Sequence, residues 1–183
     1  MATDTIGFLD RVVARSVPIV GYSAGAIVAL WVAVRRPDLV AKLVLISGTF
    51  RGDGAILRPV AGAAMPPPLV AAYGEVSPDG VDHFPIVVAK IARAAAEQPE
   101  LTERQLCDIR CPALVMAADD DNVKLEHTVE LYGTLSDAQL AIVPGTSHLL
   151  LHEKPELCAR LVNDFLAADS VSTLMPIRRR LKG

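Results

Sequence analysis

The sequence of 183 residues has few cysteines, few aromatic residues and no strong excess of charge of one sign. Its three cysteines, Cys107, Cys111 and Cys158, are odd in number and lack C-x-x-C spacing. They therefore argue against a disulfide framework and indicate reduced thiols in a cytoplasmic protein. A formal net charge of −3 gives no electrostatic basis for binding nucleic acid or an anionic membrane, so we expect neither as a partner.

Long apolar runs are missing as well, although 51% of the residues are hydrophobic. No stretch approaches the roughly 18 consecutive apolar residues that a membrane span needs. The first residues do not resemble a signal peptide, because no charged segment precedes an apolar core. A chain of this length and composition can nevertheless bury a substantial core as one domain.

The most informative segment that is present is Gly21-Tyr22-Ser23-Ala24-Gly25. A G-x-S-x-G pattern arises by chance in roughly one chain of this length in twenty, so its context decides its meaning. The apolar run 17–20 precedes it, and an alanine- and valine-rich helical stretch over 23–36 follows it. In a sharp strand-to-helix turn, a side chain at either glycine would collide with neighbouring backbone, and Ser23 would be pushed into the open.

A serine at such a turn becomes a nucleophile when a base removes its proton and a third group orients the base. His148 follows the apolar run 140–143, and the triplet Asp119-Asp120-Asp121 follows the apolar run 113–118. We expect one of these carboxylates to face the histidine. The N–H of Ala24, at the start of the expected helix, would be placed to bind an oxyanion.

The chain order Ser, Asp, His resembles that of the α/β-hydrolase superfamily over most of the sequence. Members commonly carry Gly-Asp-x-Asp after the strand before the acid, and here Ala118 takes the place of the glycine. The resemblance implies that Asp121 is the catalytic acid, that Asp119 is structural and that Asp120 is the alternative acid. Some members carry the acid after the preceding strand, where Asp53 is the nearby carboxylate. A serine at the turn argues against the dehalogenase and epoxide hydrolase branches, which use aspartate there.

The remaining pattern predicts an α/β fold. Four apolar runs without polar alternation indicate a mostly parallel sheet covered on both faces, hence a three-layer αβα architecture. Helical periodicity after the acidic triplet predicts a helix with Leu125, Val129 and Tyr132 on its inner face. Residues 1–50 and 109–169 would form a core like the second half of the α/β-hydrolase fold. Residues 51–108, rich in proline, would form a small helical and irregular cap insertion, and 170–183 a basic tail.

The superfamily's nucleophile turn usually follows the fifth of eight strands, whereas here it comes at residue 23. The first four strands and the loop that carries the second oxyanion donor have no counterpart. We therefore expect the chain to be a fragment or a shortened product. The run Val17 to Val20 would then be a hydrophobic sheet edge through which the chain could associate with itself.

The resemblance implies a serine hydrolase that needs no cofactor and acts on a small-molecule substrate. Ser23, Asp121 and His148 would be catalytic, Ala24 would supply an oxyanion donor, and Tyr22 would contribute to substrate binding. A small apolar carboxylic ester is the first candidate substrate, followed by C–C bond hydrolysis and perhydrolase chemistry. The alternative from another class is a non-catalytic ligand sensor or regulator, or an inactive truncated hydrolase.

Metal binding is not expected. His148 and His152 are separated by three leucines, a pattern that does not suit a zinc-binding helix face. His83 and His127 have no partner pattern in the sequence and are predicted to lie at the surface or in helix caps.

Overall fold

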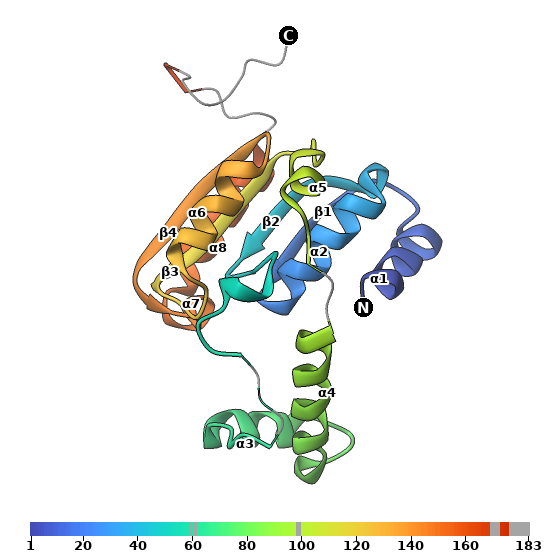
Figure 1. Ribbon diagram of the computed structural model, residues 1–183, viewed down its shortest axis with the longest axis vertical. Coiled ribbons are helices and arrows are strands. Elements are labelled where there is room, and N and C mark those ends of the chain that lie inside the picture. The colour runs from blue at the N-terminus through green and yellow to red at the C-terminus, as the bar shows by residue number, and fades with distance from the viewer. Residues whose placement is uncertain (59, 61, 98–99, 169–172, 176–183) are drawn as a thin grey trace. The chain divides into compact units, whose positions relative to one another are not determined.

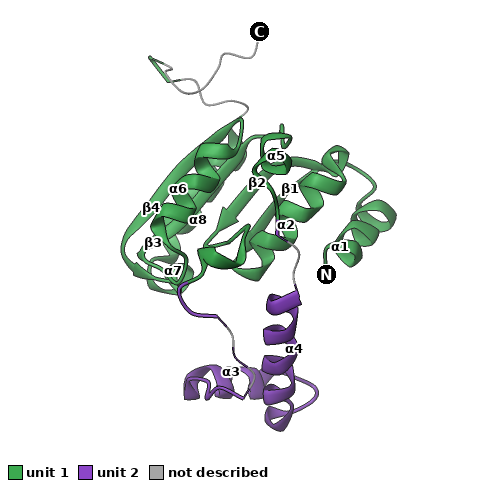
Figure 2. Ribbon diagram, viewed as in Figure 1, with its two compact units in different colours: residues 1–55, 101–183 green, residues 56–100 purple. Residues whose placement is uncertain are grey.

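The computed structural model describes residues 1–58, 60, 62–97, 100–168 and 173–175. The chain divides into two compact units, one of residues 1–55 with 101–183 and one of residues 56–100 (Figure 2). The second unit is shorter than the predicted insertion of residues 51–108. Leu101 and Leu106 are buried in the core of the first unit, and the Leu101 N–H donates to the Phe50 carbonyl (3.0 Å).

A four-stranded sheet forms the centre of the first unit (Figure 1). The strands are β1 (Val17–Tyr22), β2 (Val40–Ile46), β3 (Ala113–Asp120) and β4 (Ala138–Ser147). They lie in chain order, and every neighbouring pair is parallel, which confirms the predicted sheet. All four carboxyl ends therefore meet at one edge.

Helices cover both faces of this sheet. One face packs against α1 (Ala2–Phe8), α2 (Ala24–Arg35), α5 (Glu103–Cys107) and α6 (Leu125–Thr134); the other packs against α7 (Leu150–Glu153) and α8 (Pro155–Ala167). Alternate residues of β2 divide between the two apolar clusters, with Leu43 and Leu45 in one and Val44 and Ile46 in the other. A strand buried on both faces must be apolar throughout, which explains the missing polar alternation. The three-layer αβα architecture is thus confirmed.

β1 lies at one end of the strand order. Its pairing along β2 is complete, and among the described residues no other strand pairs with it. Val20 is 51% exposed, although β1 is as apolar as its neighbours. Self-association through this edge stays a prediction.

The described part of the second unit contains a short 3-10 helix, Val81–His83, and two α-helices, α3 (Pro67–Val76) and α4 (Phe84–Glu97). The rings of Tyr73 and Phe84 join them, with centroids 4.7 Å apart. A hollow of about 420 Å³ lies within this unit, and its lining includes the apolar side chains of Met65, Val70, Val81, Phe84 and Val88. None of the helices in the described parts of the chain combines the length and the apolar character that crossing a membrane requires.

Candidate active site

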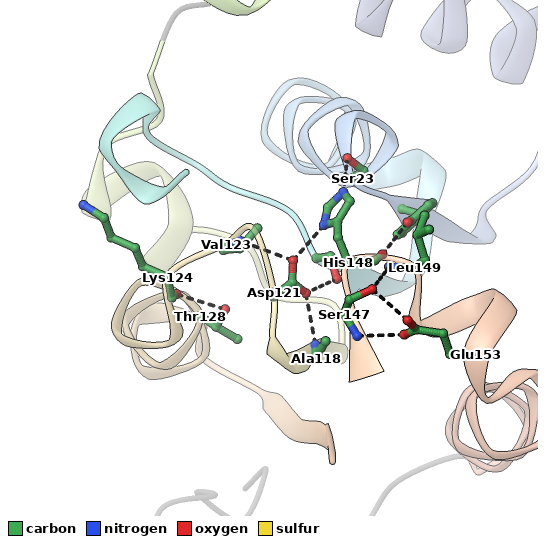
Figure 3. Close-up of polar contacts among 12 residues, drawn as sticks. Ser23, Ala118, Asp121, Val123, Lys124, Thr128, Ser147, His148, Leu149 and Glu153 are labelled. Carbon is green, nitrogen blue, oxygen red and sulfur yellow. Dashed lines mark hydrogen bonds and ion pairs between the residues drawn. The ribbon is translucent and has the colours of Figure 1, made fainter. Parts of the chain in front are cut away.

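The residue that directly follows each of the four strands lies at the same edge of the sheet. Ser23 follows β1, Ser47 follows β2, Asp121 follows β3 and His148 follows β4. Open α/β sheets form their sites at the carboxyl ends of parallel strands. The three residues predicted as a catalytic triad meet there, as Figure 3 shows.

Ser23 occupies a strained turn between β1 and α2. Its φ of 54° and ψ of −118° lie outside the regions that residues with a side chain ordinarily adopt. The Ser23 N–H donates to the Ile46 carbonyl (2.8 Å), which ties the turn to β2. The Ser23 carbonyl accepts from the Ala26 N–H (3.0 Å) in the first turn of α2. The serine is therefore held between a strand and a helix N-terminus.

The two glycines that flank this turn differ in their surroundings. A Cβ atom on Gly21 would lie 2.4 Å from the Gly25 carbonyl oxygen and 2.7 Å from the Ala26 Cα, both of them backbone atoms. A Cβ on Gly25 would meet no described atom within 4 Å. The prediction that a side chain would collide with backbone is confirmed for Gly21. It is wrong for Gly25, because that residue lies exposed on α2.

His148 links the serine to the aspartate. Its Nε2 lies 3.0 Å from Ser23 Oγ, and its Nδ1 lies 2.7 Å from Asp121 Oδ1. An ionised carboxylate can only accept hydrogen bonds, so Nδ1 carries the proton and Nε2 is the acceptor for the Ser23 hydroxyl. This tautomer can receive a proton from the serine.

Asp121 is buried and fully bonded, with a side chain that is 1% exposed. Oδ1 accepts from His148 and from the Val123 N–H (3.2 Å), while Oδ2 accepts from Ser47 Oγ (2.5 Å) and from the Ala118 N–H (3.0 Å). Burial by itself would raise the pKa of Asp121. The hydrogen bonds from His148, Ser47 and the two N–H groups outweigh burial and lower the pKa to about 2. The carboxylate is therefore charged at neutral pH.

His148 has to reach Ser23 past the ends of two intervening strands. The first and last strands are three spacings apart, about 14 Å, which is more than the two side chains can span. The backbone after β4 must therefore fold back over the sheet edge. A bulge near the end of the β3–β4 pair begins this path, and Asp119 stabilises it by accepting from the N–H groups of Gly145 (2.9 Å) and Thr146 (3.0 Å). This is the structural role that the sequence predicted for Asp119.

Contacts made by Glu153 and Tyr22 fix the residues around His148. Glu153 accepts from the Ser147 N–H (2.7 Å) and the Ser147 hydroxyl (2.9 Å). The Tyr22 hydroxyl donates to the His148 carbonyl (2.5 Å), and the Tyr22 and His148 rings lie 5.4 Å apart. Burial, followed by the charges of Asp121 and Glu153, raises the pKa of Tyr22 and keeps it a donor. Tyr22 thus contacts the histidine, and its part in substrate binding stays a prediction.

The other candidate residues occupy different positions. Ala24 is exposed and is the first residue of α2, so its N–H is among those without an acceptor inside the helix. Asp120 is exposed, and Asp53 forms an ion pair with Arg51 (3.3 Å). Of the three carboxylates considered as the acid, Asp121 is the one within hydrogen-bond distance of His148. Where the chain is described, no group of three or more His, Cys, Asp or Glu could hold a metal ion.

His127 corrects two predictions. It is 4% exposed, its ring stacks on Phe50 at 4.2 Å, and its Nε2 accepts from the Phe50 N–H (3.1 Å). It is therefore a core residue and not a surface or cap residue. The predicted inner face of α6 is wrong for Leu125 and Val129, which are 46% and 47% exposed, whereas Tyr132 packs against the core. The polar residue turns inward since its hydrogen bond satisfies a buried backbone donor.

Ser47 was missed by the sequence analysis. It is 3% exposed, has a φ of +49°, and donates from Oγ to Asp121 Oδ2. The available signal was its position, since it is the first polar residue after the apolar run 43–46 and should lie at the same edge as Ser23 and Asp121. Because a serine followed by Gly48 is typical of an ordinary turn, the position of Ser47 at this edge was not recognised from the sequence.

Residues 2–161 of the chain match the alpha/beta hydrolase family. The chain belongs to this family. This hydrolase is 28% identical over 194 residues to RutD of Caulobacter sp. (strain K31), a candidate carbamate hydrolase, and the match covers 93% of the chain and 72% of RutD.

Solved structures of other hydrolases share the fold. The meta-cleavage product hydrolase CumD of Pseudomonas fluorescens IP01 aligns with a TM-score of 0.67 at 19% identity, over 90% of this chain and 69% of CumD. The enol-lactonase of Burkholderia xenovorans LB400 aligns with a TM-score of 0.65 at 19% identity, over 91% of this chain and 72% of the lactonase. Matches at this identity establish the fold.

Proposed function

We propose that this alpha/beta hydrolase is a serine hydrolase that cleaves a small apolar carboxylic ester, or a related acyl compound, through an acyl-enzyme. The observation that carries this proposal is the unbroken hydrogen-bond chain from Ser23 through His148 to Asp121. A buried charged carboxylate, a histidine in the accepting tautomer and a serine on a strained turn are the three parts that nucleophilic acyl transfer requires.

In the first half of the reaction Ser23 Oγ attacks the substrate carbonyl carbon while its proton moves to His148 Nε2. The tetrahedral intermediate collapses when His148 returns that proton to the leaving group, which leaves the acyl group on Ser23. Asp121 stabilises the transient positive charge on the imidazole through Nδ1. The Ala24 N–H, at the positive end of α2, would bind the negative oxygen of the intermediate.

In the second half of the reaction His148 takes a proton from a water molecule, which attacks the acyl carbon. Collapse of the second intermediate returns the proton to Ser23 Oγ and releases the carboxylic acid. The same three side chains therefore serve both halves without a cofactor.

The substrate class is the finer part of the proposal. Carbamates, enol-lactones and carboxylic esters all present an acyl carbon bonded to a leaving oxygen or nitrogen, and the first two occur in the names of proteins similar to this chain. We assign the second unit, residues 56–100, the role of the cap predicted from the sequence. The hollow in that unit has a mostly apolar lining, with Asp82 as its charged member, and this supports a substrate with an apolar group.

The first test is covalent labelling of the parent chain with a fluorophosphonate, followed by intact-mass analysis. We expect one adduct on the parent and none on Ser23→Ala. Ser16→Ala removes an exposed serine just before β1 and should be labelled like the parent. An unlabelled parent that is folded, or an adduct that persists in Ser23→Ala, would contradict the proposal.

A second measurement addresses the substrate. Phenylbutyrate esters, an aryl lactone and an aryl carbamate present similar apolar groups on different acyl chemistry. Turnover of the ester above the lactone and carbamate, lost in Ser23→Ala, is the expected result. Faster turnover of the carbamate would transfer the assignment to carbamate hydrolysis by the same three residues.

A further inference from the structure

We propose that Ser47 is a positioning residue that holds the Asp121 carboxylate in the orientation that His148 needs, an inference that rests on the proposed serine hydrolase function. Ser47 comes from a different strand than the three triad residues. It follows β2, the strand that lies between the one before Ser23 and the one before Asp121.

The contacts of Ser47 indicate that its hydroxyl serves as a hydrogen-bond donor to Asp121. Its N–H is already used, since it donates to the Met116 carbonyl (2.8 Å) and continues the β2–β3 ladder. The side chain is buried, and Oγ lies 2.5 Å from Asp121 Oδ2. A charged carboxylate offers no proton, so the hydroxyl donates to it.

The two oxygens of Asp121 are divided between separate sets of donors. Oδ1 is bonded to the His148 ring, and Oδ2 is bonded to Ser47 and to the Ala118 N–H. Ser47 and Ala118 therefore oppose rotation of the carboxylate and keep Oδ1 aimed at Nδ1. Among the four donors described for Asp121, His148 and Ser47 contribute side chains, and Ala118 and Val123 contribute backbone N–H groups.

The backbone at Ser47 supports a role for its side chain. Among the described residues, Ala14, Ser23 and Ser47 are the three non-glycine residues with positive φ, and two of them lie at this edge of the sheet. Glycine would adopt the φ of +49° at Ser47 without strain, but it has no hydroxyl. Strained backbone of this kind concentrates at functional sites.

During proton transfer the imidazole becomes positively charged and relies on a fixed anionic partner. Without Ser47, Oδ2 would keep the Ala118 N–H as a donor but would lose the hydroxyl, so the buried carboxylate would be held less firmly against rotation. A hydrogen bond to a charged group is strong enough that we expect the rate of Ser23 labelling to fall about tenfold.

The test compares Ser47→Gly and Ser47→Ala with the parent, alone and combined with Asp121→Asn. Ser47→Gly removes the hydroxyl and suits the backbone, so it separates the hydrogen bond from folding. We expect labelling of Ser23 to fall about tenfold in both single variants. In the Asp121→Asn background the same substitutions should cause no further loss, because Ser47 acts through the charged aspartate. Ser136→Ala, which removes a hydroxyl bonded to the Ile109 carbonyl (2.8 Å), is the control and should match the parent.

A spectroscopic readout keeps this inference distinct from the proposed function. The His148 Nδ1 proton, held against Asp121, should give a far-downfield proton resonance that Asp121→Asn abolishes and Ser47→Gly shifts or broadens. If the parent cannot be labelled, the proposed function fails, and this resonance still tests the Ser47 contact. An unchanged resonance and labelling rate in folded Ser47→Gly, or an equal loss with and without the Asp121 carboxylate, would overturn the inference.

Discussion

Replacing Gly21 by alanine should disrupt the turn that carries Ser23. The added Cβ would lie 2.4 Å, 2.6 Å and 2.7 Å from the Gly25 oxygen, the Gly25 carbonyl carbon and the Ala26 Cα. Ordinary carbon contacts are about 3.5–4 Å, so the first turn of α2 would have to move by roughly 1 Å. The atoms in the way are backbone atoms, and no rotation of a side chain can remove the overlap.

Two magnitudes follow from this displacement. Overpacking a close-packed site costs about 1–3 kcal/mol, and we expect the upper end of that range because helix backbone must shift. The shift would also move Ser23 relative to His148, from which it is now separated by 3.0 Å. A misplacement of about 1 Å at a reacting group can reduce the rate about 10²-fold. Gly21→Ala should therefore lose both stability and Ser23 labelling.

Urea unfolding followed by the fluorescence of Trp31 provides the assay, because this single tryptophan lies on α2 itself. Gly25→Ala is the matched control. That position is helical and open, so alanine there should leave stability unchanged or raise it by up to about 1 kcal/mol. The explanation would be refuted if Gly21→Ala had the same free energy of unfolding and the same labelling rate as the parent. It would also be refuted if Gly25→Ala lost as much of both. In either case, contact with the first turn of α2 would not be the reason for glycine at residue 21.

Two further predictions concern buried groups. His127→Phe should keep the stack on Phe50 but leave the Phe50 N–H without an acceptor, so urea titrations should show a free energy of unfolding lower by about 1–3 kcal/mol. His127→Gln retains an acceptor and should lose less stability. Equal losses in the two variants would refute the role of the hydrogen bond. The pKa of Asp121 is lowered from 3.8 to about 2, so the folded chain binds this proton less readily than the unfolded chain. Stability from Asp121 is thus complete above the ordinary pKa and lost as the pH falls through about 2, an effect of about 2 kcal/mol. Urea titrations from pH 5 to pH 2 should show a shallower loss in Asp121→Asn, and identical slopes would contradict the assignment.

The sheet and the triad positions could be predicted from the sequence because both depend on local patterns. Strands buried on both faces must be apolar throughout, and parallel strands bring their carboxyl ends to one edge. Ser23, Asp121 and His148 each stand just after such a run. Their meeting in space follows from these two rules, whereas their catalytic roles remain predictions.

The residues that were misjudged depend on partners far along the chain. His127 looks like a surface residue because nothing near it in sequence suggests a use for its ring. Its partner is the N–H of Phe50, 77 positions away. The face of α6 was likewise assigned from hydrophobicity, but a buried donor that needs an acceptor placed the histidine inside and left Leu125 and Val129 partly exposed.

The position of Ser47 could also have been predicted from the rule that residues following parallel strands meet at one edge of the sheet. The strands lie in chain order, so the residue after β2 must lie between the residue after β1 and the residue after β3. When a nucleophile and an acid follow the outer two of three adjacent strands, the residue after the middle strand therefore lies between them at the same sheet edge. A small residue with a hydroxyl there can donate to the acid without reaching the nucleophile's proton. Testing Ser47 in the presence and absence of the Asp121 carboxylate thus asks whether the order of strands alone identifies a residue that supports a triad.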